Sequence, residues 1–347
     1  MVPLRWSPLL AVLLACGCNG SSDKAQANPA SSTTAAAAPS AAPIVSIPGV
    51  ETGPMTAREQ REWSEQVQTL LAPCPETPVS IGQCIQEKRA CKTCVPAALY
   101  LLDAVRAGKS KQDREKAYNM RFDPKKVRTI DIDGCPELGP PDAPVTIVEW
   151  ADFECPACKA FYPLLDGLVK RFPGQVRLVY KNYPLSIHPH GEIAARAGVA
   201  AARQGKFWEM HHVLFDNQER LEQSDLEGYA KQLKLDVGKF KSEMGSDDTV
   251  ARITRDKRAA DEVNLDSTPT VFINGREVDT QLLDDPVGDL VKWVKLDLEL
   301  AGVTPAPPPP MPATSASADA PPPPSASASA GPSPSASAVP SAGPTKK

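Results

Sequence analysis

Between residues 128 and 302 the hydrophobic positions change their spacing in a way that separates strands from helices. The run VTIVEWAD (145–152) is almost continuously apolar, as in a strand that is buried on both faces of a sheet. PACKAFYPLLDGLVKRFP (156–173) follows with helical spacing, and VRLVYKNYP (176–184) returns to a strand pattern. The first part of this region is therefore predicted as strand, helix, strand.

Helical spacing then dominates until the strand pattern returns near residue 270. TVFING (270–275) ends in Asn-Gly, a common hairpin turn, and REV (276–278) continues as its partner, before a last helix over 285–301. This order predicts an α/β domain over residues 128–302 with a helical insertion. The four inserted helices are predicted over 192–204, 206–218, 224–235 and 248–264.

A small helical module is predicted over residues 54–127. Three helices are predicted: one over 57–72 capped by Thr56, one over 95–108 ended by Gly108, and one over 111–122 capped by Ser110. This module is rich in cysteine, with four cysteines between the helix over 57–72 and the helix over 95–108. They are Cys74, Cys84, Cys91 and Cys94.

Segments rich in Pro, Ala and Ser flank the two folded parts. Residues 19–53 and 303–347 offer little apolar surface to bury, so both are expected to stay disordered. The first is interpreted as a tether. The second is interpreted as a spacer, with contact to a cell wall or a partner as the alternative.

Residues 1–18 have the pattern of an export signal. A single Arg precedes an apolar stretch that is too short to span a bilayer as a mature helix. Leu13-Leu14-Ala15-Cys16 resembles a bacterial lipobox, which implies cleavage before Cys16 and lipidation of its thiol. Cys18 is the second choice, and an ordinary cleaved signal without lipid is the alternative. The expected location is the cell envelope on its periplasmic side, held to a membrane by the lipid, with the membrane itself left open.

The net charge of −4 gives no sign of a basic face, so nucleic-acid binding is not expected. Export matters more for the chemistry, because cysteines outside the cytoplasm are usually paired or catalytic.

Cys155 and Cys158 form a Cys-x-x-Cys pair at the predicted junction of a strand and a helix. Such a pair can be a structural disulfide, half of a metal site, or a redox couple. Free backbone N–H groups and the helix dipole favour a thiolate at Cys155, and Pro156 suits the first helical position. Cys158 lies on the same helical face within bonding reach. Cys155 is therefore predicted as the nucleophile and Cys158 as the resolving thiol.

The module cysteines are predicted to form two structural disulfides, which stabilise a small domain. A second redox-active pair and a zinc or copper site made of these four thiols are the alternatives, and no metal is assigned. Cys135 is left over: it is free, or paired with Cys18 or with a module cysteine.

Residues 128–302 resemble the DsbA-type thioredoxin-fold disulfide oxidoreductases of the bacterial envelope. The resemblance rests on PDAPVTIVEWADFECPAC, YPLSIHPHGEIAARA, FWEMHHVLF and STPTVFINGR, and covers about half of the chain. It implies a thioredoxin fold with a helical insertion. It also implies a cis-Pro loop at Thr268-Pro269 facing the cysteines, where a substrate strand binds beside Pro156 and Ala157.

By the same resemblance, Glu149 is a buried acid that moves protons to and from Cys158; a strand-end glutamate without a role is the alternative. Glu154 is expected to face water and to oppose thiolate formation mildly. His188 and His190 are expected to pack at a helix start, with shaping of the active-site mouth as the alternative. His211 and His212 are expected to be structural.

The resulting hypothesis is an envelope thiol–disulfide oxidoreductase that needs no bound cofactor. Its expected partners are exported proteins with thiols or disulfides and a separate redox protein. Oxidation of substrates is favoured over reduction or isomerisation only by a small margin. Pro-Ala between the cysteines lacks the histidine of strongly oxidising relatives, which suggests a less oxidising couple. A chaperone-like binding protein and a metallochaperone for copper are the other classes.

Overall fold

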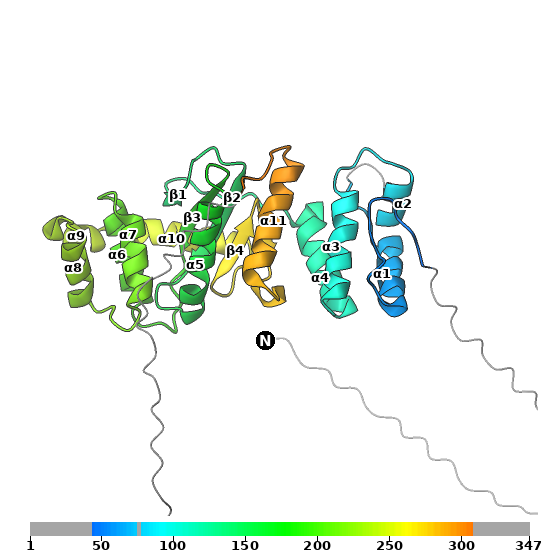
Figure 1. Cartoon of the computed structure of the whole chain (residues 1–347). Coiled ribbons are helices and arrows are strands. Elements are labelled where there is room, and N and C mark those ends of the chain that lie inside the picture. Colours follow the sequence, from blue (N-terminus) through cyan, green and yellow to red (C-terminus); the bar gives the residue numbers. More distant parts are fainter. Residues whose placement is uncertain (1–43, 75–77, 308–347) are drawn as a thin grey trace, which may run out of the picture.

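The computed structural model describes residues 44–74 and 78–307, which form a helical module followed by an α/β domain (Figure 1). The module contains α1 (Ala57–Thr69), α2 (Ile81–Gln86), α3 (Cys94–Arg106), α4 (Lys111–Phe122) and the short 3-10 helix η1 (Pro124–Lys126).

The module closes around a buried tryptophan. Trp63 on α1 is fully buried, and its indole N–H donates to the Ala98 carbonyl of α3 at 2.9 Å. Thr56 caps α1 in a capping box with Glu59, and Ser110 caps α4, as the sequence predicts.

The α/β domain is built on a five-stranded sheet in the order β1-β3-β2-β4-β5. β2 pairs in parallel with β3, while β1, β4 and β5 pair antiparallel to their neighbours. This is a thioredoxin-like sheet, as expected. The strands are β1 (Glu137–Leu138), β2 (Val145–Ala151), β3 (Val176–Asn182), β4 (Thr270–Ile273) and β5 (Arg276–Val278).

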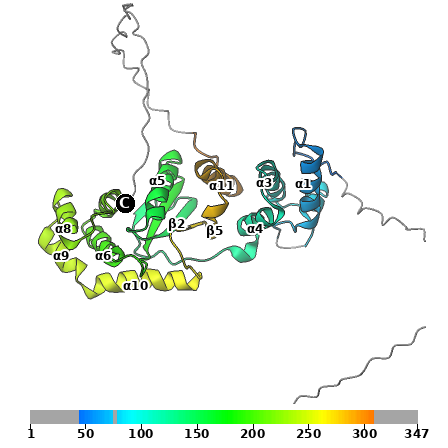
Figure 2. The ribbon, with the colours of Figure 1, turned by 90° about the horizontal axis from the view of Figure 1, so that it is seen from below.

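Helices cover both faces of the sheet. α5 (Pro156–Arg171) and α11 (Pro286–Leu300) pack on one face, against alternate strand residues such as Ile147. The long helix α10 (Asp247–Glu262) covers the other face, where Trp150 and Phe272 are buried (Figure 2). The near-continuous apolar pattern of β2 follows from this double burial.

The helical insertion lies between β3 and β4 and adds its own core. Its helices pack around a cluster of apolar residues that extends to Cys155 and Cys158, so the insertion and the cysteine pair share one hydrophobic core. Besides α10, it contains α6 (Gly191–Ala202), α7 (Phe207–Asp216), α8 (Gln223–Gln232) and α9 (Val237–Met244).

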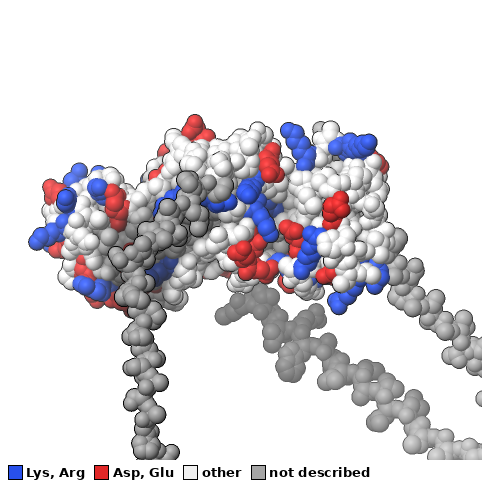
Figure 3. Space-filling model, in the orientation of Figure 1, with Lys and Arg blue, Asp and Glu red and all other residues white. Residues whose placement is uncertain are grey.

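α11 also joins the domain to the module. Arg121 of α4 is buried and makes an ion pair with Asp297 of α11 at 2.5 Å, and its guanidinium lies 4.5 Å from the Trp293 ring centroid. Leu296 packs against the module core, and a cavity of about 300 Å³ remains between α3, α4, α11 and the short 3-10 helix η2 (Thr280–Leu282). On the face seen in Figure 3, charges of both signs are mixed.

Several boundaries differ from the sequence prediction. Ile47 and Val50 are buried in the module core, so the packed chain begins ahead of residue 54. At the other end Gln175 exchanges hydrogen bonds with Thr304 and Ala306, so the described chain is still docked past residue 303. The short elements α2, α9 and β1 were not predicted, because each is too brief to show a period.

The predicted signal and lipidation site (1–18, with Cys16 and Cys18) lie outside the described residues, as do residues 19–43 of the predicted tether and 308–347 of the predicted tail. Within 44–74 and 78–307, no helix combines the length and hydropathy that crossing a bilayer requires.

Candidate active site

Cys155 lies at the start of α5, where β2 has just ended. It is the residue before the first helical position, and Pro156 occupies that position. The Cys155 N–H donates to the Asp152 carbonyl at 3.0 Å, which closes the turn between strand and helix. The thiol therefore faces the unsatisfied N–H groups of the first helical turn, as the sequence predicts.

The surroundings of Cys155 favour its thiolate. Its pKa falls from 9.0 to about 5, first through a hydrogen bond from the Cys158 thiol and then through contacts with Thr268 and the backbone of Cys158 and Ala157, against an opposing effect of burial. Cys155 is 6 % exposed, so only a small part of its surface is open to an incoming sulfur.

Cys158 has the opposite character. It is fully buried, and burial, the hydrogen bond to Cys155 and the negative charge of Glu149 all raise its pKa well above 9.0. Both cysteines are thiols in this structure. The pair therefore combines one anionic, reachable sulfur with one protonated, buried sulfur.

Glu149 lies under α5. Strand alternation directs it to the same face of the sheet as Ile147, which packs against α5, and its register partner on β3 is Tyr180. Glu149 is fully buried, and neither carboxylate oxygen has a hydrogen-bond partner among the described residues. Burial, reinforced by nearby Asp166, raises its pKa to about 8.

Asp166 and His212 were not singled out as a functional pair by the sequence. Asp166 lies on α5, two turns beyond Cys158, and is buried; His212 on α7 is bonded to its Oδ2 at 2.7 Å. The other Asp166 oxygen has no partner among the described residues, while the His212 side chain is 40 % exposed. The pair thus joins a buried carboxyl, whose charge contributes to the raised pKa of Glu149, to a partly exposed imidazole.

Thr268 and Pro269 lie opposite the cysteine pair. Their peptide bond is cis, as the resemblance implies, and the Cys155 sulfur lies 3.5 Å from the Thr268 carbonyl oxygen. Pro156 and Ala157 are exposed beside Cys155, and Thr268 and Pro269 are half-buried. The structure therefore brings together the four residues expected to bind substrate.

Asp152 organises the loop before α5. It accepts hydrogen bonds from the backbone N–H groups of Glu154 and Leu185 and is bonded to His188 at 2.7 Å. At Gly191 a Cβ atom would lie 2.7 Å from its carboxylate, so only glycine fits there. Asp152 was not predicted as a site residue; its place between a buried strand and the cysteines is the sequence signal that could have marked it.

Gln218 was missed by the sequence analysis. Its side-chain amide donates to the carbonyls of Phe153 and Cys155, both at 2.8 Å, and so holds the turn from the insertion side. No local pattern marks this residue, since it ends a predicted helix far from the cysteines in the sequence.

Glu154 does not simply face water, which corrects the sequence expectation. Its carboxylate accepts from the His190 backbone N–H and is bonded to the His190 ring at 3.0 Å, and this bond raises the pKa of His190. His188 and His190 thus lie at the start of α6, as expected.

His211 is fully buried among aromatic rings, including Phe153 and Phe215, and burial lowers its pKa well below 6.5. It is therefore a neutral residue of the core.

Cys135 is a buried free thiol on the α10 side of the sheet. Its sulfur lies 2.8 Å from an Arg252 nitrogen and 3.5 Å from the Lys181 nitrogen. It is not paired with a module cysteine, which leaves Cys18 outside the described residues as the other option raised by the sequence. In the module the structure pairs Cys74 with Cys91 and Cys84 with Cys94.

Comparison with known families gives a match over the α/β domain. Residues 133–292 match the model of a thioredoxin family, described as "Thioredoxin". This range begins ahead of β1 and ends within α11, so it includes the cysteine pair, the whole insertion and the Thr268-Pro269 loop.

Curated relatives match over a similar length. A protein named Na(+)/H(+) antiporter NhaA 3 from Salinispora tropica is 43 % identical over 148 residues, which are 42 % of this chain and 22 % of that protein. An NhaA antiporter from Herminiimonas arsenicoxydans is 41 % identical over 140 residues, 40 % of this chain and 22 % of that protein. The chain spans less than a quarter of the length of these relatives.

Solved structures with a similar domain include oxidised BdbD from Bacillus subtilis, 25 % identical, with a TM-score of 0.45 over 50 % of this chain and 97 % of that chain. A thioredoxin-like oxidoreductase from Silicibacter pomeroyi is 28 % identical, with a TM-score of 0.41 over 46 % of this chain and 94 % of that chain.

Proposed function

We propose that this chain is a DsbA-like thiol–disulfide oxidoreductase that exchanges disulfides with exported proteins through Cys155 and Cys158. The match of residues 133–292 to the thioredoxin family model supports this proposal. The observation that carries the proposal is the contrast between the two sulfurs. Cys155 is held as a thiolate with a pKa of about 5, while the Cys158 thiol beside it is buried and protonated.

In the oxidising direction, a substrate thiolate attacks the Cys155 sulfur of the Cys155–Cys158 disulfide. A mixed disulfide forms, and Cys158 leaves as a thiolate. A second substrate thiolate attacks the substrate sulfur in the mixed disulfide, and Cys155 leaves. The substrate loses two electrons and two protons as its disulfide forms, and the enzyme gains two electrons as its own disulfide opens.

Glu149 is proposed to handle the proton of Cys158. With a pKa of about 8 it is mostly protonated at neutral pH, so it can donate to the Cys158 thiolate as that sulfur leaves and take the proton back in the reverse reaction. The Asp166–His212 pair offers the route by which the proton reaches solvent, because His212 is partly exposed.

The direction proposed is oxidation of substrate thiols. A thiolate that is stable in the reduced protein favours the dithiol form of the enzyme, and such a couple takes electrons from its substrates. The strong lowering of the Cys155 pKa therefore supports an oxidase, whereas the Pro-Ala dipeptide favours a milder couple. Reduction or isomerisation is the alternative direction.

Substrate binding is proposed at the surface made by Pro156, Ala157, Thr268 and Pro269. An extended substrate segment can pair with the backbone of Thr268, next to the reacting sulfur of Cys155, in the manner of an added strand.

The cell envelope remains the proposed location, with lipidation at Cys16 as the anchor and a separate redox protein as the electron partner. The antiporter function in the relatives' names is not proposed for this chain, because the matched segment is 22 % of those proteins.

Two assays test the proposal. The oxidised chain should catalyse disulfide formation in reduced ribonuclease, and Cys155→Ser should abolish this. Presented with an oxidised substrate, Cys158→Ser should instead accumulate a mixed disulfide: its Cys155 thiolate opens the substrate disulfide, one substrate sulfur leaves as a thiolate, and no resolving thiol remains to release Cys155. Cys135→Ser, which removes a buried thiol on the opposite face of the sheet, is the matched control and should keep full activity.

Equilibration with glutathione then gives the reduction potential of the Cys155–Cys158 couple, which distinguishes oxidation of substrates from reduction. A reduction potential of about −120 mV supports an oxidase, and one of about −270 mV assigns the chain to the reductases. A chain that suppresses aggregation of unfolded protein equally well without Cys155 would be a binding protein, and the redox proposal would then be wrong.

A further inference from the structure

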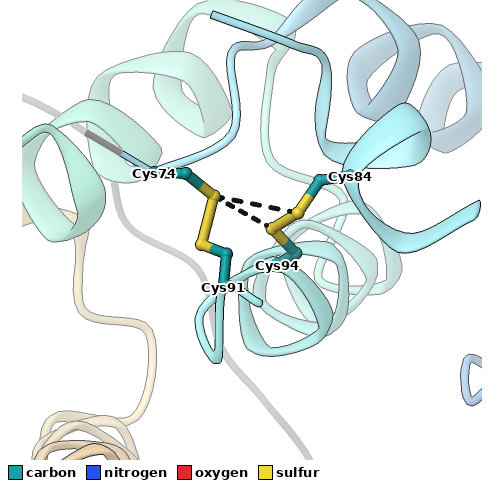
Figure 4. A group of neighbouring side chains, drawn as sticks. All are labelled: Cys74, Cys84, Cys91 and Cys94. Carbon is teal, nitrogen blue, oxygen red and sulfur yellow. Dashed lines mark hydrogen bonds between the residues drawn. A yellow bond between two sulfur atoms is a disulfide. The ribbon is translucent and has the colours of Figure 1, made fainter. Parts of the chain in front are cut away.

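The four module cysteines meet at one point although they come from different segments. Cys74 lies in the loop after α1, Cys84 in α2, Cys91 in the turn before α3, and Cys94 at the first position of α3. Figure 4 shows their side chains converging, and all four sulfur atoms lie within 4.8 Å of one another.

The two disulfides are in direct contact. The Cys74 sulfur lies 3.3 Å from the Cys94 sulfur and 3.7 Å from the Cys84 sulfur, contacts drawn as dashed lines in Figure 4. Two structural disulfides need no such contact, because each restrains its own loop independently. The contact among all four sulfur atoms is therefore not explained by a role as two structural disulfides.

These distances fit a tetrahedral thiolate site. Zinc binds cysteine sulfur at about 2.3 Å in four-coordinate tetrahedral sites, which places the sulfurs about 3.8 Å apart. The contacts of 3.3 and 3.7 Å lie close to that spacing. Opening the two S–S bonds would thus leave four thiols whose sulfur atoms already lie within 4.8 Å of one another.

The surroundings favour the charge of such a site. Four thiolates and one Zn²⁺ carry a net charge of −2. Cys94 begins α3, where the helix dipole stabilises an anion, and the Thr93 hydroxyl lies 3.1 Å from the Cys91 sulfur, within reach to donate to a thiolate. Lys92 lies between Cys91 and Cys94 in the chain and adds positive charge.

The two disulfides differ in how exposed they are to solvent. Cys84 and Cys94 are 1 % and 2 % exposed, while Cys74 and Cys91 are half-buried. A dithiol from solvent therefore meets Cys74–Cys91 first. The thiolate that this releases at Cys74 lies in contact with the inner disulfide and can open it by exchange.

We propose that the reduced cluster of Cys74, Cys84, Cys91 and Cys94 is a tetrahedral Zn²⁺ site, so that the module has a double-disulfide state and a zinc state. Two dithiol molecules supply four electrons and four protons, and leave as two disulfides. The four resulting thiols bind Zn²⁺ and release four protons. This inference is independent of the proposed function, since it involves neither Cys155 nor Cys158.

The test uses the full chain carrying Cys155→Ala and Cys158→Ala, so that the other Cys-x-x-Cys pair cannot bind metal. The protein is reduced with a phosphine under inert gas, desalted, incubated with zinc and desalted again. One zinc per chain is expected in the reduced protein by mass spectrometry of the metal, with none in the oxidised protein. Cobalt should give the visible bands and the sulfur-to-cobalt charge transfer of tetrahedral thiolate coordination.

Two control variants are matched in chemistry. Cys135→Ser removes a buried thiol outside the cluster and should keep the full zinc content. Cys74→Ser combined with Cys91→Ser removes two ligands and should lose zinc binding, while its helical circular dichroism reports whether the module stays folded. A reduced chain with no more zinc than this double variant, or with an octahedral cobalt spectrum, overturns the proposal.

Discussion

The pH dependence of Cys155 alkylation gives a direct measure of how strongly the helix start and Cys158 stabilise the thiolate. With a pKa of about 5 the thiolate fraction is about 99 % at pH 7 and still about 76 % at pH 5.5, so the reaction rate should fall by only about a quarter. A thiol with the ordinary pKa of 9.0 loses about 30-fold over the same interval.

The ratio of the alkylation rates at pH 7 and pH 5.5 depends only on the pKa of the thiol. Limited access to a residue that is 6 % exposed lowers the rates at the two pH values equally, and so does the weaker nucleophilicity of a stable thiolate. The comparison therefore reports the pKa of Cys155 without knowledge of the absolute rate.

The assay uses the reduced protein, iodoacetamide, and mass spectrometry of the peptide that contains Cys155. Cys158→Ala removes the largest stabilising contact and should move the midpoint of the rate profile upward from about 5. Glu149→Gln acts beside Cys158 and should leave the Cys155 profile unchanged. A fall of about 30-fold between pH 7 and pH 5.5 in the unsubstituted protein would refute the reasoning, because the thiolate would then have no special environment.

Three further predictions concern stability. Between about pH 5 and 9, the free energy of unfolding of the dithiol form, measured in urea, should rise relative to that of the disulfide form by about 1.4 kcal/mol per pH unit. The reason is that the lowered pKa of Cys155 contributes stability that is lost as pH falls through about 5. A difference in unfolding free energy that does not change with pH contradicts this. In the oxidised protein the raised pKa of Glu149 should cost stability as pH rises from about 4.5 to 8, and Glu149→Gln should remove that slope; equal slopes would count against its burial as a neutral acid. Arg121→Ala leaves Asp297 buried without its main cation and should cost about 3 kcal/mol, while Arg121→Ala with Asp297→Asn should cost less; equal losses would mean that the ion pair is not what matters.

Much of the fold could be predicted because the long elements have clear periods and caps. The strand over 145–151, the helix that starts after Cys155 and the cap at Ser110 all follow from local patterns. The elements that escaped prediction are short and are set by their surroundings. β1, for example, has two residues and exists because it pairs with β3.

The residues of the candidate site likewise fall into those that could be predicted from the sequence and those that could not. Cys155 and Cys158 carry a local motif, and Glu149 was expected from the family resemblance; the structure places it on the sheet face beneath α5. Gln218 and His212 could not be found, because each reaches the site from the insertion, about 60 and 50 residues beyond the cysteines. Their roles depend on how α7 packs on α5, which a single sequence does not specify.

The position of α11 has a consequence for how the protein is made. One side of this helix packs on the sheet through Leu290 and Leu298, and another side faces the module, where Asp297 pairs with Arg121 and Leu296 packs against the module core. A ribosome synthesises the module first and reaches Pro286 only after the whole sheet and the insertion have been synthesised. During synthesis the module therefore exposes the surface that α11 later covers. A premature stop codon before α11 would leave both the module and the sheet without this packing partner.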